Sequence, residues 1–275
     1  MTLDRVMALP RPLAFVLPGG GALGAYQVGV LRALAEAGVH PDMLVGVSAG
    51  AVNAALAAWN PGVAGSARIE SLWRSIKRRD LLRVEPGRVA LAFTGRRSSF
   101  LDNRYGEVFL RRTFGFRLLQ DAPVRVVVIA TNLFNGRAVA LTAGDAASAI
   151  MASSAFPGVY PPVERDGLLL IDGGVVADMP LDLTLELGAA SALVLSVPPL
   201  AEGPPPMRAI DLLFRASTFG VEAHDRTTLL RPPEGLAVLE VLAPPSSVTT
   251  FAVGHAGAII DESYANAVSW LKPAG

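Results

Sequence analysis

The sequence predicts an α/β protein with a mostly parallel sheet covered by helices on both faces. Short, continuously apolar runs alternate with stretches of helical periodicity along most of the chain. Such runs are typical of strands buried on both faces of a sheet, and the strand–helix alternation favours an α/β architecture. A chain of 275 residues can build one large core, and we expect a single domain over residues 1–275.

The first half of the chain contains three expected strands. Leu13–Leu17 ends in a glycine-rich loop, and a helix is expected over about 22–37. A second strand, 43–47, is followed closely by a helix over 52–59. The strongest strand signal is 124–130, because five of these seven residues are Val or Ile.

The second half continues the alternation, with two short hairpins. Asn135-Gly136 and Asp166-Gly167 are typical of hairpin turns. They lead into expected strands at 139–141 and 168–171. The remaining expected elements are strands over 192–197 and 236–242 and helices over 146–153, 181–187, about 208–226 and about 257–271.

The pattern loosens over about 66–120, which we interpret as an insertion packed over one edge of the sheet. It contains one amphipathic helix, through Ile69 and Trp73, and a second helical stretch near 105–112. From Arg68 to Arg117 there are 13 basic and 5 acidic residues, a local charge of +8 in a chain of net charge zero. The segment is either an ordinary solvated face or a surface for transient contact with an anionic membrane.

Composition excludes several classes of protein. Without cysteine, the chain has no disulfide, no thiolate metal site and no cysteine nucleophile. No apolar run approaches the roughly 20 residues that a membrane-spanning helix needs. Prolines at positions 10, 12 and 18 argue against the helical core of a signal peptide. We therefore expect a cytoplasmic protein, at most peripheral at the membrane.

The central motif is Gly46-Val47-Ser48-Ala49-Gly50, between an expected strand and an expected helix. Strand, sharp turn and helix form the context of a G-x-S-x-G nucleophile elbow, in which the serine hydroxyl projects beyond the sheet. Glycines two residues either side of Ser48 allow the strand and the helix to approach closely. The alternative is a tight turn that happens to contain a serine.

A glycine loop, Gly19-Gly20-Gly21, follows the first strand and leads towards Gly24 and a helix. Bare N–H groups at a helix N-terminus can bind an anion, such as the oxyanion of an acyl-transfer intermediate. The loop also fits the G-x-G-x-x-G pattern of dinucleotide-binding proteins. That alternative requires an acidic residue at the end of the second strand, whereas Asp42 precedes this strand and Ser48 follows it.

A third loop, Asp172-Gly173-Gly174, follows the apolar run 168–171. Asp172 is either an ordinary turn residue or a carboxylate at the carboxyl edge of the sheet, where ligands of parallel α/β sheets bind. Because Ser48 and the glycine loop are expected at the same edge, we favour a shared site.

A serine nucleophile needs a base. In an α/β-hydrolase order, His224 or His255 would be that base and Asp172 would orient it. His224 lies on an expected amphipathic helix, and His255 lies just before the last helix. Neither is in a loop expected at the carboxyl edge, but His255 stays open as a candidate.

Several stretches resemble the patatin-like phospholipase family in order and spacing, and the similarity covers about residues 12–200. Leu23 and Asp178 depart from it, since many members carry Arg or Lys at the first position and Asn is usual at the second. The stretches are Gly19–Gln27, Gly46–Gly50, Ala152–Pro162 and Asp172–Gly174, with Ser99–Asn103 similar to a segment of bacterial members.

The resemblance implies a three-layer α/β/α fold and a Ser–Asp dyad that hydrolyses acyl esters of lipids, such as phospholipids or lysophospholipids, without histidine. Ser48 would be the nucleophile and Asp172 the base. No cofactor and no metal is implied. Two further alternatives are a dehydrogenase that binds NAD(P) at the glycine loop and a catalytically silent lipid-binding module. The resemblance assigns the oxyanion loop to Gly19, Gly20 and Gly21, and the motif glycines are Gly24, Gly46, Gly50, Gly173 and Gly174.

Overall fold

The structure is a computed structural model that describes residues 2–81, 83–199, 209–246, 248 and 252–272. Within these residues, eight strands form one sheet with the hydrogen-bonded order β5-β6-β3-β2-β1-β7-β8, and β4 pairs with β3. The strands are β1 (Leu13–Leu17), β2 (Met43–Val47), β3 (Arg125–Asn132), β4 (Ala138–Leu141), β5 (Val163–Arg165), β6 (Leu168–Asp172), β7 (Ser191–Leu195) and β8 (Ala237–Val241).

The central pairings are parallel. Strand β1 pairs in parallel with β2 and β7, β2 with β3, and β7 with β8. The pairings of β3 with β4 and β6, and of β5 with β6, are antiparallel. Both predicted hairpin turns are confirmed: Gly136 and Gly167 have positive φ, and Asp166 adopts φ 51°. The sheet is mostly parallel, as predicted.

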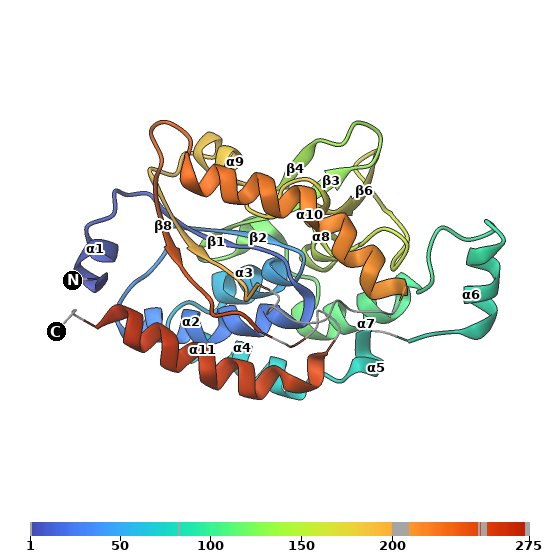
Figure 1. Ribbon diagram of the computed structural model, residues 1–275, viewed down its shortest axis with the longest axis horizontal. Helices are drawn as coiled ribbons and strands as arrows, with labels where there is room; N and C mark the ends of the chain where they lie inside the picture. The colour runs from blue at the N-terminus through green and yellow to red at the C-terminus, as the bar shows by residue number, and fades with distance from the viewer. Residues whose placement is uncertain (1, 82, 200–208, 247, 249–251, 273–275) are drawn as a thin grey trace.

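Helices cover both faces of this sheet, which makes three layers (Figure 1). One layer contains α2, α3, α4 and α11, and the opposite layer contains α9 and α10. The helices are α1 (Thr2–Met7), α2 (Ala25–Glu36), α3 (Ala49–Trp59), α4 (Val63–Ser75), α5 (Arg78–Leu81), α6 (Pro86–Phe93), α7 (Asn103–Phe114), α8 (Ala146–Ser153), α9 (Leu181–Glu186), α10 (Ala209–Leu230) and α11 (Ala256–Leu271), with 3₁₀ turns η1 (Gly21–Gly24), η2 (Leu119–Asp121), η3 (Gly173–Val175) and η4 (Val253–His255).

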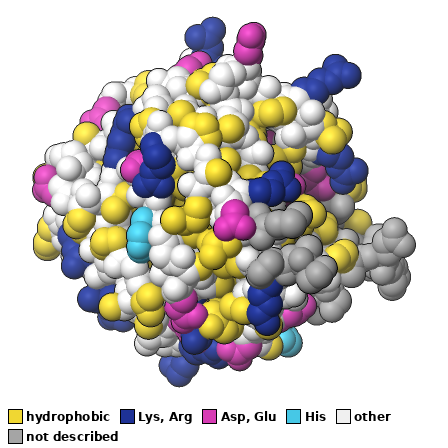
Figure 2. Space-filling model, turned by 90° about the vertical axis from the view of Figure 1, so that its left-hand side faces the viewer, with side chains coloured by type: hydrophobic (Ala, Val, Ile, Leu, Met, Phe, Trp, Pro, Cys, Tyr) yellow, Lys and Arg dark blue, Asp and Glu magenta, His cyan; other side chains and the backbone are white. Residues whose placement is uncertain are grey.

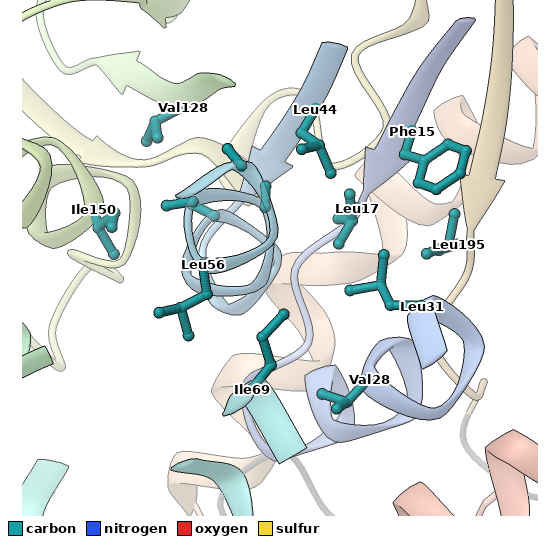
Figure 3. Close-up of a cluster of buried hydrophobic side chains, with 14 of the residues drawn as sticks. Phe15, Leu17, Val28, Leu31, Leu44, Leu56, Ile69, Val128, Ile150 and Leu195 are labelled. Carbon is teal, nitrogen blue, oxygen red and sulfur yellow. The ribbon is translucent and has the colours of Figure 1, made fainter. Parts of the chain in front are cut away.

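The alternation of side chains along the strands divides the core in two. Phe15 and Leu17 of β1 point into the larger cluster, with α2 and α3 (Figure 3), whereas Ala14 and Val16 point into the smaller one, with α9. All five residues of β1 are buried. Burial on both faces explains why these strands are continuous apolar runs in the sequence.

The segment 66–120 differs in part from its expected place. Helix α4 packs against α2, α3 and α11, so it extends the helical layer rather than covering a sheet edge. Helix α7 packs against α8, and α6 stands apart from the layers at one end of the molecule (Figure 1). Helix α1 was not expected from the sequence, and the predicted helix over 22–37 begins as η1. None of the helices in the described ranges combines the length and apolarity needed to cross a bilayer.

Candidate active site

Ser48 occupies a strained turn between β2 and α3. Its backbone adopts φ 51° and ψ −120°, a region that residues other than glycine rarely use. A Cβ added to Gly46 would lie 2.6 Å from Cα of Ala51, and one added to Gly50 would lie 2.0 Å from the carbonyl oxygen of Leu17. Both motif glycines are therefore required for the helix to close against the strands, as the elbow interpretation predicts.

The pairing of β3 explains how Asp172 reaches this turn. Ile129 pairs with Val47 on one side and with β4 on the other, and the next residue, Ala130, pairs with Asp172 and again with β4. Strands β2 and β6 therefore lie end to end along the same edge of β3. Ser48 follows the last residue of β2, and Asp172 is the last residue of β6, so the two meet where the strands converge.

The direction of β6 explains how Asp172 reaches the carboxyl edge of the sheet. Strand β6 is antiparallel to β3. It starts beyond the carboxyl edge and runs back towards it. Asp172 therefore lies at the edge where the sequence analysis expected it, on a strand for which no direction was predicted.

Ser48 and Asp172 are directly hydrogen-bonded. The hydroxyl of Ser48 donates to Oδ2 of Asp172 at 2.8 Å, and the N–H of Gly174 donates to Oδ1 at 2.9 Å. Ser48 is half-buried, whereas Asp172 is only 4% exposed. Burial raises the pKa of Asp172 to about 7; the hydrogen bonds from Gly174 and Ser48 oppose this shift, and the nearby Asp178 adds to it. A carboxylate with this pKa is a usable base near neutral pH.

Ser153 is a site residue to which the sequence analysis assigned no role. Its hydroxyl accepts the backbone N–H of Ser48 at 2.8 Å and donates to the carbonyl oxygen of Ile129. Ser153 is fully buried at the end of α8. Its hydrogen bond holds the backbone of Ser48 in place, although the two residues are 105 positions apart in the chain. The only available signal was its place within the family-like stretch Ala152–Pro162.

The glycine loop lies against Ser48. A Cβ added to Gly19 would lie 3.2 Å from Cβ of Ser48, and Gly20 and Gly21 have φ values of 140° and 57°. The N–H of Gly19 donates to Oδ1 of Asp178 at 2.7 Å. In this arrangement the Gly19 N–H is engaged within the protein. The oxyanion role of the loop stays a prediction, for which the N–H groups of Gly20 and Gly21 are the candidates.

Asp178 brings a second carboxylate to the site. A Cβ added to Gly174 would lie 3.0 Å from Oδ1 of Asp178 and 3.3 Å from Oδ1 of Asp172, so both carboxylates border Gly174. Burial raises the pKa of Asp178 to about 6. Asp225, on α10, is also buried. Its burial and the charge of Asp178 raise the pKa of Asp225 to about 7.

A buried amide network supports the loop from the other side. The side-chain amide of Gln27 donates to the carbonyl oxygen of Pro18 at 2.8 Å. The side-chain amide of Asn53 donates to the carbonyl oxygen of Gly24 at 2.8 Å and to the side-chain oxygen Oε1 of Gln27 at 2.9 Å. Asn53 also accepts the indole N–H of Trp73 at 2.7 Å. The network connects both ends of the glycine loop to α3 and α4.

The other predicted candidates lie elsewhere. His40, His224 and His255 are all exposed, and the hydroxyl of Ser48 is donated to Asp172. Asp42, the acidic residue considered for a dinucleotide ribose, binds Arg11 and the N–H of Leu13, at the start of β1.

The carboxylates beside the glycine loop limit the ligands that this loop can bind. Asp172 and Asp178 would oppose the negative charge of a dinucleotide pyrophosphate at this loop. Within the ranges that the structure describes, no group of three or more acidic or histidine side chains is arranged to hold a metal ion.

The fold and the site together define an α/β protein in which a serine on a sharp turn between a strand and a helix is hydrogen-bonded to a buried aspartate. The family model of the patatin-like phospholipases matches residues 15–185. This match covers more than half of the chain and includes Ser48 and Asp172. The chain belongs to the patatin-like phospholipase family.

Related sequences agree with this assignment. An uncharacterised NTE family protein of Mycobacterium bovis is 31% identical over 198 residues, which are 71% of this chain and 51% of that protein. Lysophospholipase NTE1 of Phaeosphaeria nodorum is 29% identical over 203 residues, 71% of this chain and 12% of that protein. The chain therefore spans about half the length of the mycobacterial relative and a small part of the fungal one.

Solved structures with a similar arrangement include VipD from Legionella pneumophila and the type III effector ExoU from Pseudomonas aeruginosa. VipD is 15% identical with a TM-score of 0.49, over 95% of this chain and 67% of that chain. ExoU is 18% identical with a TM-score of 0.38, over 96% of this chain and 53% of that chain.

Proposed function

We propose that the protein is a serine acyl hydrolase that cleaves acyl esters of lipids through a Ser48–Asp172 dyad. The observation that carries this proposal is the direct hydrogen bond of 2.8 Å between the hydroxyl of Ser48 and Asp172. Ser48 lies on a strained elbow and Asp172 has a pKa raised to about 7. Together they supply a nucleophile and a base suited to neutral pH.

In the first half of the reaction, the Ser48 oxygen attacks the acyl carbonyl carbon and its proton passes to Asp172. The carbonyl electron pair moves onto oxygen, where the N–H groups of Gly20 and Gly21 stabilise the negative charge. The intermediate then collapses, the bond to the leaving alcohol breaks, and Asp172 gives its proton to the alcohol oxygen. An acyl ester on Ser48 remains.

In the second half, Asp172 takes a proton from water as the water oxygen attacks the acyl carbon. Collapse of this second intermediate breaks the bond to Ser48 and releases the carboxylic acid. Ser48 recovers its proton from Asp172. The chemistry consumes one ester and one water, and the dyad returns to its starting protonation state.

Phospholipids and lysophospholipids are the proposed substrates. Relatives named lysophospholipase and neuropathy target esterase support this choice, although the chain spans only 12–13% of those proteins. The acyl position and chain length are the variables that a panel of defined lipids would determine.

Probe labelling and substitution at Ser48 test the proposal. A fluorophosphonate should add one label at Ser48, and Ser48→Ala should abolish labelling and lower kcat by about 10⁴-fold or more. Activity should be measured on nitrophenyl esters and then on phospholipids. Liposome binding without release of fatty acid from any of these substrates would instead indicate a lipid-binding module.

We also propose transient contact between the arginine-rich segment, 68–117, and an anionic membrane surface. Arg78, Arg79, Arg96 and Arg97 are all exposed. Each basic residue near such a surface contributes about 1 kcal/mol, and salt screens the attraction. Replacing these four residues with Glu should weaken sedimentation with anionic liposomes at low salt. Equal binding to neutral and anionic liposomes would contradict the proposal.

A further inference from the structure

Helix α6 differs from the helices that form the two layers in having no buried residue. In Figure 1 it stands at the opposite end of the molecule from α1, the helix that precedes β1. Strand β1, which follows α1 in the chain, and its parallel neighbours end at the side of the sheet away from α1, so α6 lies at the end where these strands terminate (Figure 1). Ser48 follows the last residue of β2 at this end.

The outward face of α6 contains no charged side chain. At 100° per residue, the half-buried residues Arg88, Val89 and Ala92 share one side of the helix. The opposite side is exposed and consists of Pro86, Gly87, Ala90 and Leu91. Phe93, the last residue of the helix, is also exposed but lies at the border of this side, about 160° around the helix from Leu91. Solvent-facing sides of helices normally carry polar residues, whereas the exposed side of α6 carries none.

Several large apolar side chains of this region are exposed. Phe93 is 79% exposed and Leu91 is 37% exposed, and Val84, just before the helix, is 59% exposed. On the molecule's opposite end, shown in Figure 2, hydrophobic side chains are instead interspersed with charges of both signs. Helix α6 and its exposed neighbours therefore form a distinct surface, which we call the α6 arm (residues 83–97).

Within the arm, exposed arginines lie on both sides of the helix: Arg83 before it and Arg96 and Arg97 after it. The acidic residue of the arm, Glu85, is half-buried and accepts the hydroxyl of Tyr105 at 3.0 Å. An uncharged apolar helix face between cationic side chains fits the boundary between anionic headgroups and acyl chains, where interfacial helices lie.

The base of the arm is tied to the protein. Arg88 donates to the carbonyl oxygen of Leu101 at 2.7 Å and to Asp102 at 2.8 Å. The ring of Phe93 lies 5.4 Å from that of Phe100, measured between centroids, and Phe93 is still 79% exposed. These contacts hold the helix at a fixed place while its outer face stays exposed.

The residues at the foot of the arm are also hydrogen-bonded to the segment that follows α8, the helix that ends at Ser153. The N–H groups of Phe100 and Leu101 donate to the carbonyl oxygens of Gly158 and Val159 at 2.8 and 2.9 Å. These acceptors follow closely after Ser153, which binds the N–H of Ser48. The arm and the nucleophile are therefore connected through a few hydrogen-bonded residues.

We infer that the α6 arm is a membrane-insertion element that places the exposed side chain of Phe93 among the acyl chains of an anionic phospholipid bilayer. This inference rests on the proposed lipid hydrolysis and deepens it. Insertion at this end of the molecule brings the bilayer to the edge of the sheet that holds Ser48. Arginine contact alone would give salt-sensitive attraction, whereas insertion adds a binding contribution that salt does not screen.

The test compares two variants of similar exposure. Phe93→Asp removes the most exposed apolar side chain of the arm, which is 79% exposed. Leu230→Asp is the matched control, because Leu230 is 78% exposed at the end of α10 that leads into β8. Binding is measured by flotation with vesicles of about 70% phosphatidylcholine and 30% phosphatidylserine. The anionic phosphatidylserine gives the vesicles the negative surface that attracts basic segments. All proteins carry Ser48→Ala, so hydrolysis does not alter the vesicles.

We expect the arm variant to lose about tenfold or more in vesicle partitioning, also at high salt, and the control to keep it. With Ser48 restored, both should hydrolyse a soluble short-chain nitrophenyl ester at the wild-type rate, which shows that the dyad is intact. A Phe93→Trp variant should show fluorescence quenching by vesicles with brominated acyl chains. Unchanged partitioning of the arm variant, equal loss in the control, or absence of quenching would overturn the inference.

Failure of the proposed function gives a different result. A protein that binds vesicles through the arm but hydrolyses no ester, soluble or membrane-bound, would retain the insertion element and lose the dyad mechanism. Self-association that depends on Phe93, with vesicle binding unaffected by the arm variant, would instead identify the arm as a protein interface and overturn the inference.

Discussion

The backbone N–H of Gly19 donates a hydrogen bond of 2.7 Å to Oδ1 of Asp178, which lies 159 positions later in the chain. This bond connects the glycine loop to the segment that follows Asp172. It also places a second carboxylate close enough to Asp172 to raise the pKa of that residue. Asp178 therefore has two separable effects on the site, one through its hydrogen bond and one through its charge.

The first prediction separates these effects. Asp178→Asn keeps an oxygen acceptor for the Gly19 N–H but removes the charge, so the pKa of Asp172 should fall and the acidic limb of kcat/KM should move to lower pH. Asp178→Ala leaves the Gly19 N–H without its acceptor, which should lower kcat by roughly 10-fold or more. The measurement is a pH profile of each variant. Identical profiles for Asp178→Asn and wild type would show that the charge has no influence.

The second prediction concerns the pH dependence of the wild-type enzyme. Asp172 can accept a proton from Ser48 only when it is ionised, and burial raises its pKa to about 7. Activity should therefore be lost as the pH falls through about 7, approaching a tenfold loss for each further unit. Initial rates on a nitrophenyl ester, corrected for nitrophenol ionisation, give this profile. A flat profile down to pH 5 would contradict the raised pKa.

The third prediction is a stability effect of the same carboxylate. Because the pKa of Asp172 is raised from 3.8 to about 7, the folded protein binds this proton more tightly than the unfolded chain does. The free energy of unfolding should therefore decrease as the pH rises from about 4 to about 7. Asp172→Asn cannot ionise, so it should raise Tm relative to wild type at pH 8 and much less at pH 4. Calorimetry at the two pH values makes the comparison.

The fourth prediction distinguishes the dyad from a triad. Replacing His40, His224 and His255 together with Gln should leave most of the activity, because all three side chains are exposed and Ser48 donates to Asp172. Asp172→Asn should lose most of it, since no base would then receive the serine proton. A folded histidine variant without activity would show that a histidine participates and would reject the dyad.

The strands and the elbow could be predicted because they depend on local patterns. Leu13–Leu17 and 43–47 were predicted with the bounds that the structure has, since residues buried on both faces leave continuous apolar runs. The role of Ser153 and the Gly19–Asp178 bond could not be predicted. Each connects residues more than 100 positions apart, and neither leaves a periodic pattern. The direction of β6 could not be predicted either, because a strand's apolar pattern does not show which neighbour it pairs with.

The last prediction concerns the amide network beneath the glycine loop. Asn53 is fully buried, donates to the carbonyl oxygen of Gly24 and to the side-chain oxygen of Gln27, and accepts from Trp73. Asn53→Leu has a similar volume but leaves these partners unpaired in the core, so the free energy of unfolding should fall by about 3 kcal/mol. Asn60→Ala is the control, because Asn60 is half-buried at the other end of the same helix and donates only to Leu56.

Denaturant unfolding and ester hydrolysis should be measured on both variants. Asn53→Leu should lose activity in conditions where it remains folded. The network holds Gly24 and, through Gln27, Pro18, which are the two ends of the glycine loop. In the proposed mechanism the N–H groups of this loop stabilise the developing oxyanion. The control should lose less than about 1 kcal/mol and keep its activity. If Asn53→Leu unfolds earlier yet hydrolyses esters at the wild-type rate when folded, the network stabilises the core without positioning the loop.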